Sequence, residues 1–105
     1  MRKLHHFGIP TTVKQANESY AADLKVWLTD ISSSPNKIEY LRFEQGSCMA
    51  DIIQTMPHIA YEVDSLEAEL EGAKILLEPM VLSDKLTIAF IEEEGIAIEI
   101  MYCNE

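Results

Sequence analysis

The chain has 105 residues, 48% of them hydrophobic and 25% charged, with a net charge of −10 at pH 7. This length allows one domain with a modest core. An acidic excess this large disfavours binding to nucleic acid or to an anionic membrane surface, because both repel negative charge. We expect no membrane span and no signal peptide, because no apolar run is long enough for the first and none follows Arg2 and Lys3 for the second.

The start of the chain predicts a strand and a short helix. Residues 3–9 are typical of a strand, which Pro10 ends because proline cannot donate to a sheet ladder. Residues 14–23 are mostly polar but carry Ala16, Tyr20 and Ala21 at helical spacing, which indicates a short helix.

Two further strands are expected before the middle of the chain. Residues 24–29 and 38–44 are rich in β-forming side chains, and residues 32–36 between them contain the serines and proline of a loop. A last strand of this half would have to fall in residues 47–54, where the strand pattern is weak.

The second half has a clearer pattern. A helix is expected to begin at Asp64, which can cap the free amides while Glu67 reaches back as in a capping box. Residues 93–95 (Glu-Glu-Gly) are typical of a hairpin turn. Strands are expected over residues 58–63, 74–78, 86–92 and 96–102.

The two halves look like copies of one unit. Residues 6–9 (His-Phe-Gly-Ile) and 58–61 (His-Ile-Ala-Tyr) share the order histidine, large apolar, small, large apolar. We therefore predict a single α+β domain over residues 1–105, built from paired βαβββ units, about 1–54 and about 57–105, with the first unit shortened. A half of this size cannot bury both faces of its own sheet, so the units should pack side by side into a curved mixed sheet around a cup.

Strand parity brings three possible metal ligands to one face of that sheet. Side chains alternate across a strand, so His6, His58 and Glu99 can all point into the cup. The repeat selects His6 over His5, which parity places on the opposite face. Two imidazoles and one carboxylate suit a divalent Zn, Ni, Co, Mn or Fe ion and leave open positions for a substrate. The alternative is that both histidines are structural and Glu99 is an exposed strand charge.

Parity also assigns the two faces of residues 38–44. Leu41 and Phe43 are the better pair to pack under a helix, which would aim Tyr40, Arg42 and Glu44 into the cup as substrate-binding residues. Arg42 could then clamp a carboxylate or phosphate on the substrate, or it could be a surface arginine.

The quoted tetrapeptides, the leucine-rich segment that follows residues 58–64, and residues 95–100 (Gly-Ile-Ala-Ile-Glu-Ile) resemble the glyoxalase / bleomycin-resistance / dioxygenase family, the vicinal oxygen chelate superfamily. The resemblance is closest to its methylmalonyl-CoA epimerase and lactoylglutathione lyase branch. It implies a metal held by the first, fourth, fifth and eighth strands, with His6, His58 and Glu99 on the first, fifth and eighth. The fourth-strand ligand is left open among Glu39, Glu44 and Asp51.

Two functions are compatible with this resemblance. One is a metal-dependent lyase or isomerase acting on a small carbonyl compound, such as a thioester or hemithioacetal, with Glu44 or Glu62 as the proton-transferring carboxylate. The other is a non-catalytic protein that sequesters a small molecule without a metal in a cup lined by aromatic and apolar side chains. We expect a homodimer, since family members often pair, and a cytoplasmic location, since Cys48 and Cys103 have the spacing of two reduced thiols.

Overall fold

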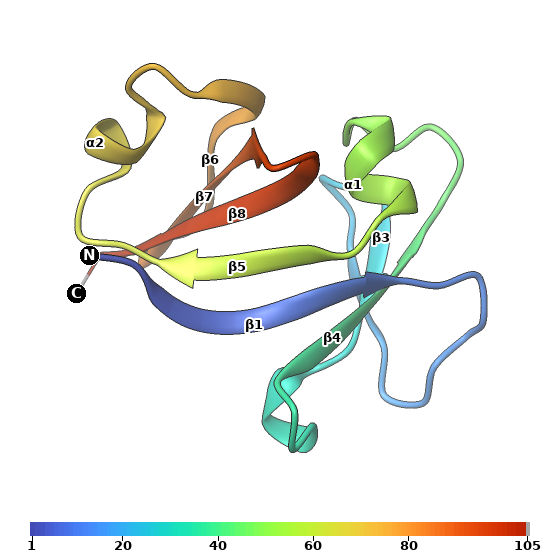
Figure 1. The fold of residues 1–105 in the computed structure, drawn as a ribbon. Helices are drawn as coiled ribbons and strands as arrows, with labels where there is room; N and C mark the ends of the chain where they lie inside the picture. Colours follow the sequence, from blue (N-terminus) through green and yellow to red (C-terminus); the bar gives the residue numbers. More distant parts are fainter. Residues whose placement is uncertain (105) are drawn as a thin grey trace.

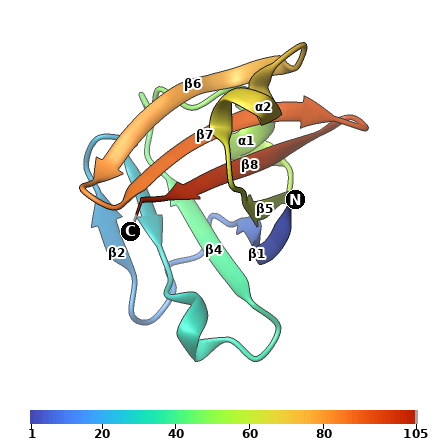
Figure 2. The ribbon, with the colours of Figure 1, turned by 90° about the vertical axis from the view of Figure 1, so that its left-hand side faces the viewer.

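A computed structural model describes residues 1–104. The fold is one eight-stranded mixed sheet that curls into a cup (Figures 1 and 2). The strands are β1 (Lys3–Pro10), β2 (Ser19–Ala21), β3 (Val26–Leu28), β4 (Ile38–Phe43), β5 (His58–Glu62), β6 (Lys74–Ser83), β7 (Leu86–Glu93) and β8 (Ile96–Cys103). The helices are a 3-10 turn η1 (Ile31–Ser33), α1 (Asp51–Thr55) and α2 (Leu66–Leu70). The predicted α+β class and curved mixed sheet are confirmed.

The strand order β2-β3-β4-β1-β5-β8-β7-β6 divides into two groups of four with the same internal order. The groups meet where β1 and β5 pair antiparallel, while β1 pairs with β4 and β5 pairs with β8 in parallel. The strands that carry the repeated histidines therefore lie side by side at the centre of the sheet.

Side chains of the second group alternate as predicted. On β8, Ile98 and Ile100 face outward and pack with residues around α2 in one apolar cluster. Ala97 and Met101 face the concave side and belong to a second apolar cluster that fills much of the cup. Glu99 lies between them in sequence and therefore also faces the cup.

The first group departs from the prediction in two places. The helix expected over residues 14–23 is wrong: Asn17 has a left-handed φ of 65°, and Ser19–Ala21 forms the edge strand β2. The strand expected within residues 47–54 is also wrong, because Asp51–Thr55 forms helix α1 and β4 is already the fourth strand. The first group is thus shortened by the loss of its helix.

Element ends also differ slightly. The third strand begins at Val26 rather than at residue 24, after a turn in which Lys25 has a φ of 50°. The cap of α2 is Ser65, whose hydroxyl accepts a hydrogen bond from the Ala68 amide, in place of the expected Asp64. The turn at residues 93–95 is confirmed, with both Glu94 and Gly95 at positive φ.

Candidate metal centre

Four side chains from the four central strands meet at the floor of the cup. His6 comes from β1, Glu39 from β4, His58 from β5 and Glu99 from β8, and one ligand atom of each lies within 4.8 Å of every other. Two ligands held about 2.0–2.2 Å from one ion can be separated by at most roughly 4.4 Å. The cluster therefore needs only a small inward movement to hold a divalent ion.

Strand pairing explains why these residues converge. His6 lies opposite Ala60, and Gly8 lies opposite His58, across the antiparallel β1–β5 pair. Gly8 also faces Glu39 on β4, while Ala60 faces Glu99 on β8. The small residues leave the space that the functional side chains occupy. A Cβ atom at Gly8 would overlap the His58 ring, so this position requires glycine.

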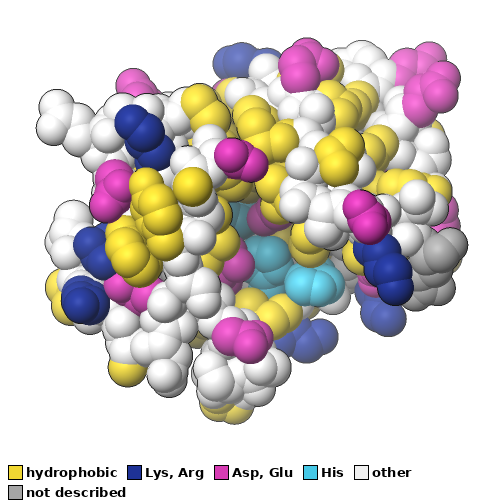
Figure 3. Space-filling model, turned by 180° about the vertical axis from the view of Figure 1, so that it is seen from behind, with side chains coloured by type: hydrophobic (Ala, Val, Ile, Leu, Met, Phe, Trp, Pro, Cys, Tyr) yellow, Lys and Arg dark blue, Asp and Glu magenta, His cyan; other side chains and the backbone are white. Residues whose placement is uncertain are grey.

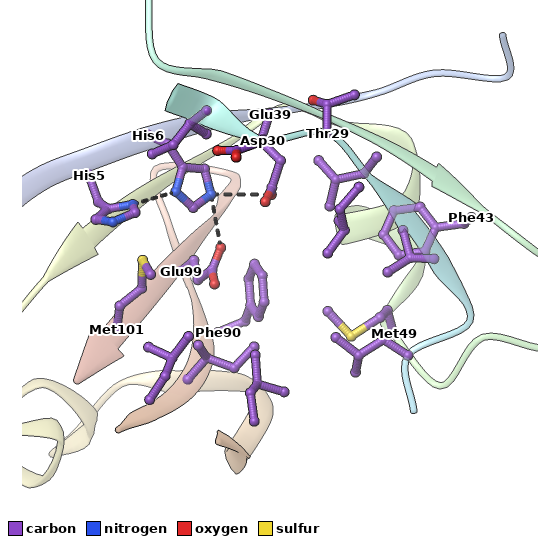
Figure 4. Close-up of a pocket in the computed structure, with 18 residues that line it drawn as sticks. His5, His6, Thr29, Asp30, Glu39, Phe43, Met49, Phe90, Glu99 and Met101 are labelled. Atoms are coloured by element: carbon purple, nitrogen blue, oxygen red, sulfur yellow. Dashed lines mark hydrogen bonds and ion pairs between the residues drawn. The ribbon is translucent and has the colours of Figure 1, made fainter. Parts of the chain in front are cut away.

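The contacts within the cluster centre on the Glu99 carboxylate. Its Oε1 lies 3.1 Å from Nε2 of His58 and 3.4 Å from Nε2 of His6. His6 Nε2 also lies 3.3 Å from Oε1 of Glu39 (Figure 4). The Phe90 and His58 rings pack in a T-shaped arrangement, with ring centroids 5.1 Å apart.

Burial gives the cluster an unusual electrostatic character. His6, His58 and Glu99 are only 3%, 1% and 7% exposed. Burial lowers the pKa of His6, but the Glu39 and Glu99 carboxylates outweigh it and raise that pKa to about 9. Burial raises the pKa of Glu99, but His58 and His6 outweigh it and hold that pKa well below its usual value. At neutral pH the metal-free cluster therefore holds a proton on His6 between two carboxylates.

Two ring nitrogens of the cluster are buried without a hydrogen-bond partner among the described residues: Nε2 of His6 and Nδ1 of His58. Nε2 of His6 has only the ion-pair contacts of 3.3 and 3.4 Å with oxygens of Glu39 and Glu99. A buried polar atom without a partner costs free energy. Two imidazoles with two carboxylates form the donor set of Zn, Co, Ni, Mn or Fe(II), and the two carboxylate charges would balance the ion.

His5 lies beside the cluster on the same side of the sheet. The register between β1 and β5 shifts between Leu4 and His6, and this irregularity turns His5 toward the cup. The strand-parity prediction that His5 faces away from the cup is therefore wrong. Nδ1 of His5 lies 2.9 Å from Nδ1 of His6, and burial together with the neighbouring His6 lowers the pKa of His5.

The cluster forms one end of a cavity of about 260 Å³. Figure 3 looks into this hollow and shows histidine at its floor with hydrophobic side chains around it. Apolar residues from both halves make most of the wall: Leu24, Val26, Leu28, Ile31, Leu41, Phe43, Met49, Leu82, Leu86, Ile88, Phe90 and Met101.

The faces of β4 are the reverse of those predicted. Leu41 and Phe43 line the cavity with Glu39, whereas Tyr40, Arg42 and Glu44 do not. On the other face, Arg42 pairs with Glu18 at 2.7 Å and lies over the Trp27 ring. Glu44 accepts hydrogen bonds from Tyr20 and Trp27.

The reason for this reversal is that the cup interior is itself apolar. Leu41 and Phe43 belong to its core, and no described helix between β1 and β2 covers the outside of β4. The placement of Tyr40, Arg42 and Glu44 inside the cup is thus corrected. Of the candidates for the fourth-strand position, Glu39 is the one that the structure brings into the cluster.

No known family profile matches the sequence, and no curated protein matches it at a significant level. Solved structures do match. A hypothetical protein from Bacillus halodurans C-125 superposes with a TM-score of 0.67 at 22% identity, over 99% of this chain and 96% of that chain. Methylmalonyl-CoA epimerase from Mycobacterium tuberculosis superposes with a TM-score of 0.59 at 17% identity, over 97% of this chain and 88% of that chain.

The fold is glyoxalase-like. The resemblance stated from the sequence is confirmed at this level, that of the vicinal oxygen chelate fold. Within this glyoxalase-like fold, the four clustered residues occupy the first, fourth, fifth and eighth strands. At identities of 22% and 17%, this similarity shows the fold alone.

Proposed function

We propose that the protein is a metal-dependent lyase or isomerase that acts on a small carbonyl compound in the cup. The observation that carries this proposal is the four-residue cluster of His6, Glu39, His58 and Glu99, of which His6, Glu39 and Glu99 line the cavity. When bound there, a divalent ion would supply a Lewis acid that polarises a substrate oxygen and stabilises the charge that develops on it.

The residues around the cluster have separate roles in this proposal. The apolar wall excludes water and orients the body of the substrate, which strengthens electrostatic interactions at the floor. A proton must also move, and a suitable base has to reach the substrate. We assign this role to Glu39, because its side chain is 18% exposed and that of Glu99 is 10% exposed. Neither Glu44 nor Glu62, the carboxylates considered from the sequence, lines the cavity.

Solvent exchange tests the proposed reaction. Protein loaded with Zn, Co, Ni or Mn is mixed in D₂O with a panel of small ketones, thioesters and hemithioacetals, and NMR follows deuterium uptake next to the carbonyl. We expect catalysed exchange with at least one compound and its loss in Glu39→Gln. Unchanged exchange in Glu39→Gln would show that Glu39 is not the base. The absence of exchange with every compound of the panel would contradict the proposal that the protein is an enzyme.

A second candidate is a metal-free protein that sequesters a small molecule. The observation that favours it is the short His6–Glu39 and His6–Glu99 contacts, with which a protonated His6 closes the cluster without an ion. It predicts that small apolar molecules bind equally well to the chelator-treated protein and to the same protein after metal is added back. A dependence of binding on metal would decide for the first candidate.

We also propose a homodimer. On the outside of the sheet, Phe7, Ile9, Ile38 and Ile59 line an apolar hollow, and Phe7 is 36% exposed. On the second group the corresponding face packs with α2. A second chain would cover the face that the missing first helix leaves open. Light scattering should then give twice the 11.9 kDa chain mass, and a monomer would contradict this.

None of the described helices has the length and apolar character needed to cross a bilayer. The cytoplasmic location expected from the sequence stays a prediction.

A further inference from the structure

The cavity has a sharp division between a polar floor and an apolar wall. Of the eighteen residues that line it, twelve are apolar. His5, His6, Glu39 and Glu99 form the floor, and Figure 4 shows Phe43, Met49 and Phe90 on the wall beside it. A ligand that fills this space therefore needs a polar head at one end and an apolar body over the rest.

Apart from His6, which lies between Glu39 and Glu99 in the cluster, the charged residues on the lining are all acidic. Glu39 and Glu99 lie at the floor, Asp30 also lines the cavity, and among the described residues that line it none is Lys or Arg. The whole chain carries a net charge of −10. A carboxylate or phosphate on the ligand body, away from the cluster, would thus lie against an apolar wall with no Lys or Arg to pair with, which is strongly unfavourable.

Both arginines of the chain form ion pairs outside the cavity. Arg42, which the sequence suggested as a clamp for an anionic substrate, instead pairs with Glu18 outside the cavity. Arg2 forms ion pairs of 2.8 Å with both Glu69 and Glu93. Neither side chain lines the cavity, so neither can neutralise an anionic ligand there.

From these observations we infer that the cup selects uncharged ligands with a short apolar body and an oxygen-donor head, and excludes ligands whose body carries a carboxylate or phosphate. This inference rests on the proposed function, in which the polar head of the ligand binds at the cluster. It adds the chemical class of the ligand body. It excludes acyl groups with a free carboxylate from the cavity.

A matched pair of chelators tests the inference on the metal-loaded protein. Hexanohydroxamic acid is uncharged at neutral pH and binds metals through two oxygens, and adipic acid monohydroxamate has the same head and chain length but ends in a carboxylate. Titration followed by the visible absorption of the cobalt-loaded protein should show at least about tenfold tighter binding of hexanohydroxamic acid. Equal binding, tighter binding of the carboxylated probe, or no binding of either would overturn the inference.

A charge placed on the lining provides the matched variants. Leu82 lines the cavity and is 41% exposed, so a lysine there can be accommodated, whereas neighbouring Val81 is 70% exposed and does not line it. Leu82→Lys should tighten binding of the carboxylated probe severalfold and leave hexanohydroxamic acid within about twofold. Val81→Lys adds the same charge to the same strand and should change neither. Identical effects of the two variants would contradict selection by the lining.

A metal-free arm separates this inference from the proposed function. Methyl signals of Met49 and Met101 are followed by NMR while cyclohexanone or cyclohexanecarboxylate is added to chelator-treated protein. We expect shifts with cyclohexanone and none with the carboxylate at equal concentration. If metal fails to bind but this preference holds, the metal-dependent function is wrong and the ligand class stands. Equal shifts, or none with either compound, would overturn the ligand class.

Discussion

Nδ1 of His5 lies 2.9 Å from Nδ1 of His6, so one proton is shared between two adjacent imidazoles at the edge of the cluster. If Nε2 of His6 faces a metal ion, its Nδ1 must carry the proton and donate it to Nδ1 of His5. A metal-binding histidine usually donates its second N–H to an acceptor that fixes the ring orientation. The register shift at β1 thus places His5 as the acceptor for His6.

Removing that acceptor should weaken metal binding. We expect His5→Ala to lower the metal affinity by about 10- to 100-fold, measured by isothermal titration calorimetry. His5→Asn, which offers an amide oxygen near the same place, should recover part of the loss. Nitrogen-15 NMR of the metal-loaded wild type should show His6 protonated at Nδ1. Unchanged affinity in His5→Ala would show that His6 does not depend on His5.

Glycine at position 8 is required by the His58 ring, which occupies the space of a Cβ atom there. Gly8→Ala should push the ring away, abolish measurable metal binding and reduce the free energy of unfolding by about 1–3 kcal/mol, as overpacking does. Gly72→Ala is the control: its positive φ strains an alanine, but nothing lies near its Cβ position. It should lose stability in urea and keep its metal. Metal binding that survives in Gly8→Ala would contradict the assigned position of His58.

Substitutions at Glu39, which lies in β4, and at Glu44, which follows its last residue, distinguish the two faces of the sheet at this strand. Glu39→Gln removes one carboxylate of the cluster and should lower metal affinity by about 10-fold or more, because charge and ligand quality both fall. Glu44→Gln affects only the outer hydrogen bonds with Tyr20 and Trp27 and should leave metal affinity unchanged. Competition with a coloured chelator measures both. The opposite order would restore the face assignment expected from the sequence.

The raised pKa of His6 makes metal-free stability depend on pH. The folded pKa is about 9 and an unfolded histidine titrates near 6.5, so the protonated ring contributes stability that is fully present below about 6.5. That contribution, of order 3 kcal/mol, is lost as the pH rises through about 9. Urea denaturation from pH 6 to 10 measures it.

A metal ion would displace this proton, so binding at pH 7 should release about one proton per chain, measured by calorimetry in buffers of different ionisation enthalpy. His6→Gln should abolish both the pH slope and the proton release. A stability that rises between pH 7 and 9 in the metal-free wild type would contradict the proton assigned to His6.

The sequence predicted the centre of the sheet well because strand alternation there is simple. The sequence predicts the strands that carry His6, His58 and Glu99, and these three side chains meet in one cluster. The absence of a helix from residues 14–23 is not predictable from the sequence, because three residues at helical spacing also suit a loop followed by a strand. Tyr20 in fact packs on Trp27 across the β2–β3 pair.

The position of His5 could not be predicted, since a register shift is a property of two paired strands and not of one segment. The sequence does not single out Glu39 among the candidates, because its apolar neighbours Leu41 and Phe43 are also typical of a strand face that packs under a helix. In a cup with an apolar interior, the same neighbours mark the ligand-facing side instead.

The metal content of the purified protein shows whether His6, Glu39, His58 and Glu99 bind one divalent ion. Purified protein is loaded with Zn, Co, Ni, Mn or Fe(II), freed of excess metal and analysed by mass spectrometry of the elements. We predict one ion per chain in the wild type and in Glu44→Gln, and less than about one tenth of an ion in His6→Ala, His58→Ala and Glu99→Ala. Substoichiometric metal in the wild type, or full occupancy in those three alanine variants, would contradict metal binding by this cluster.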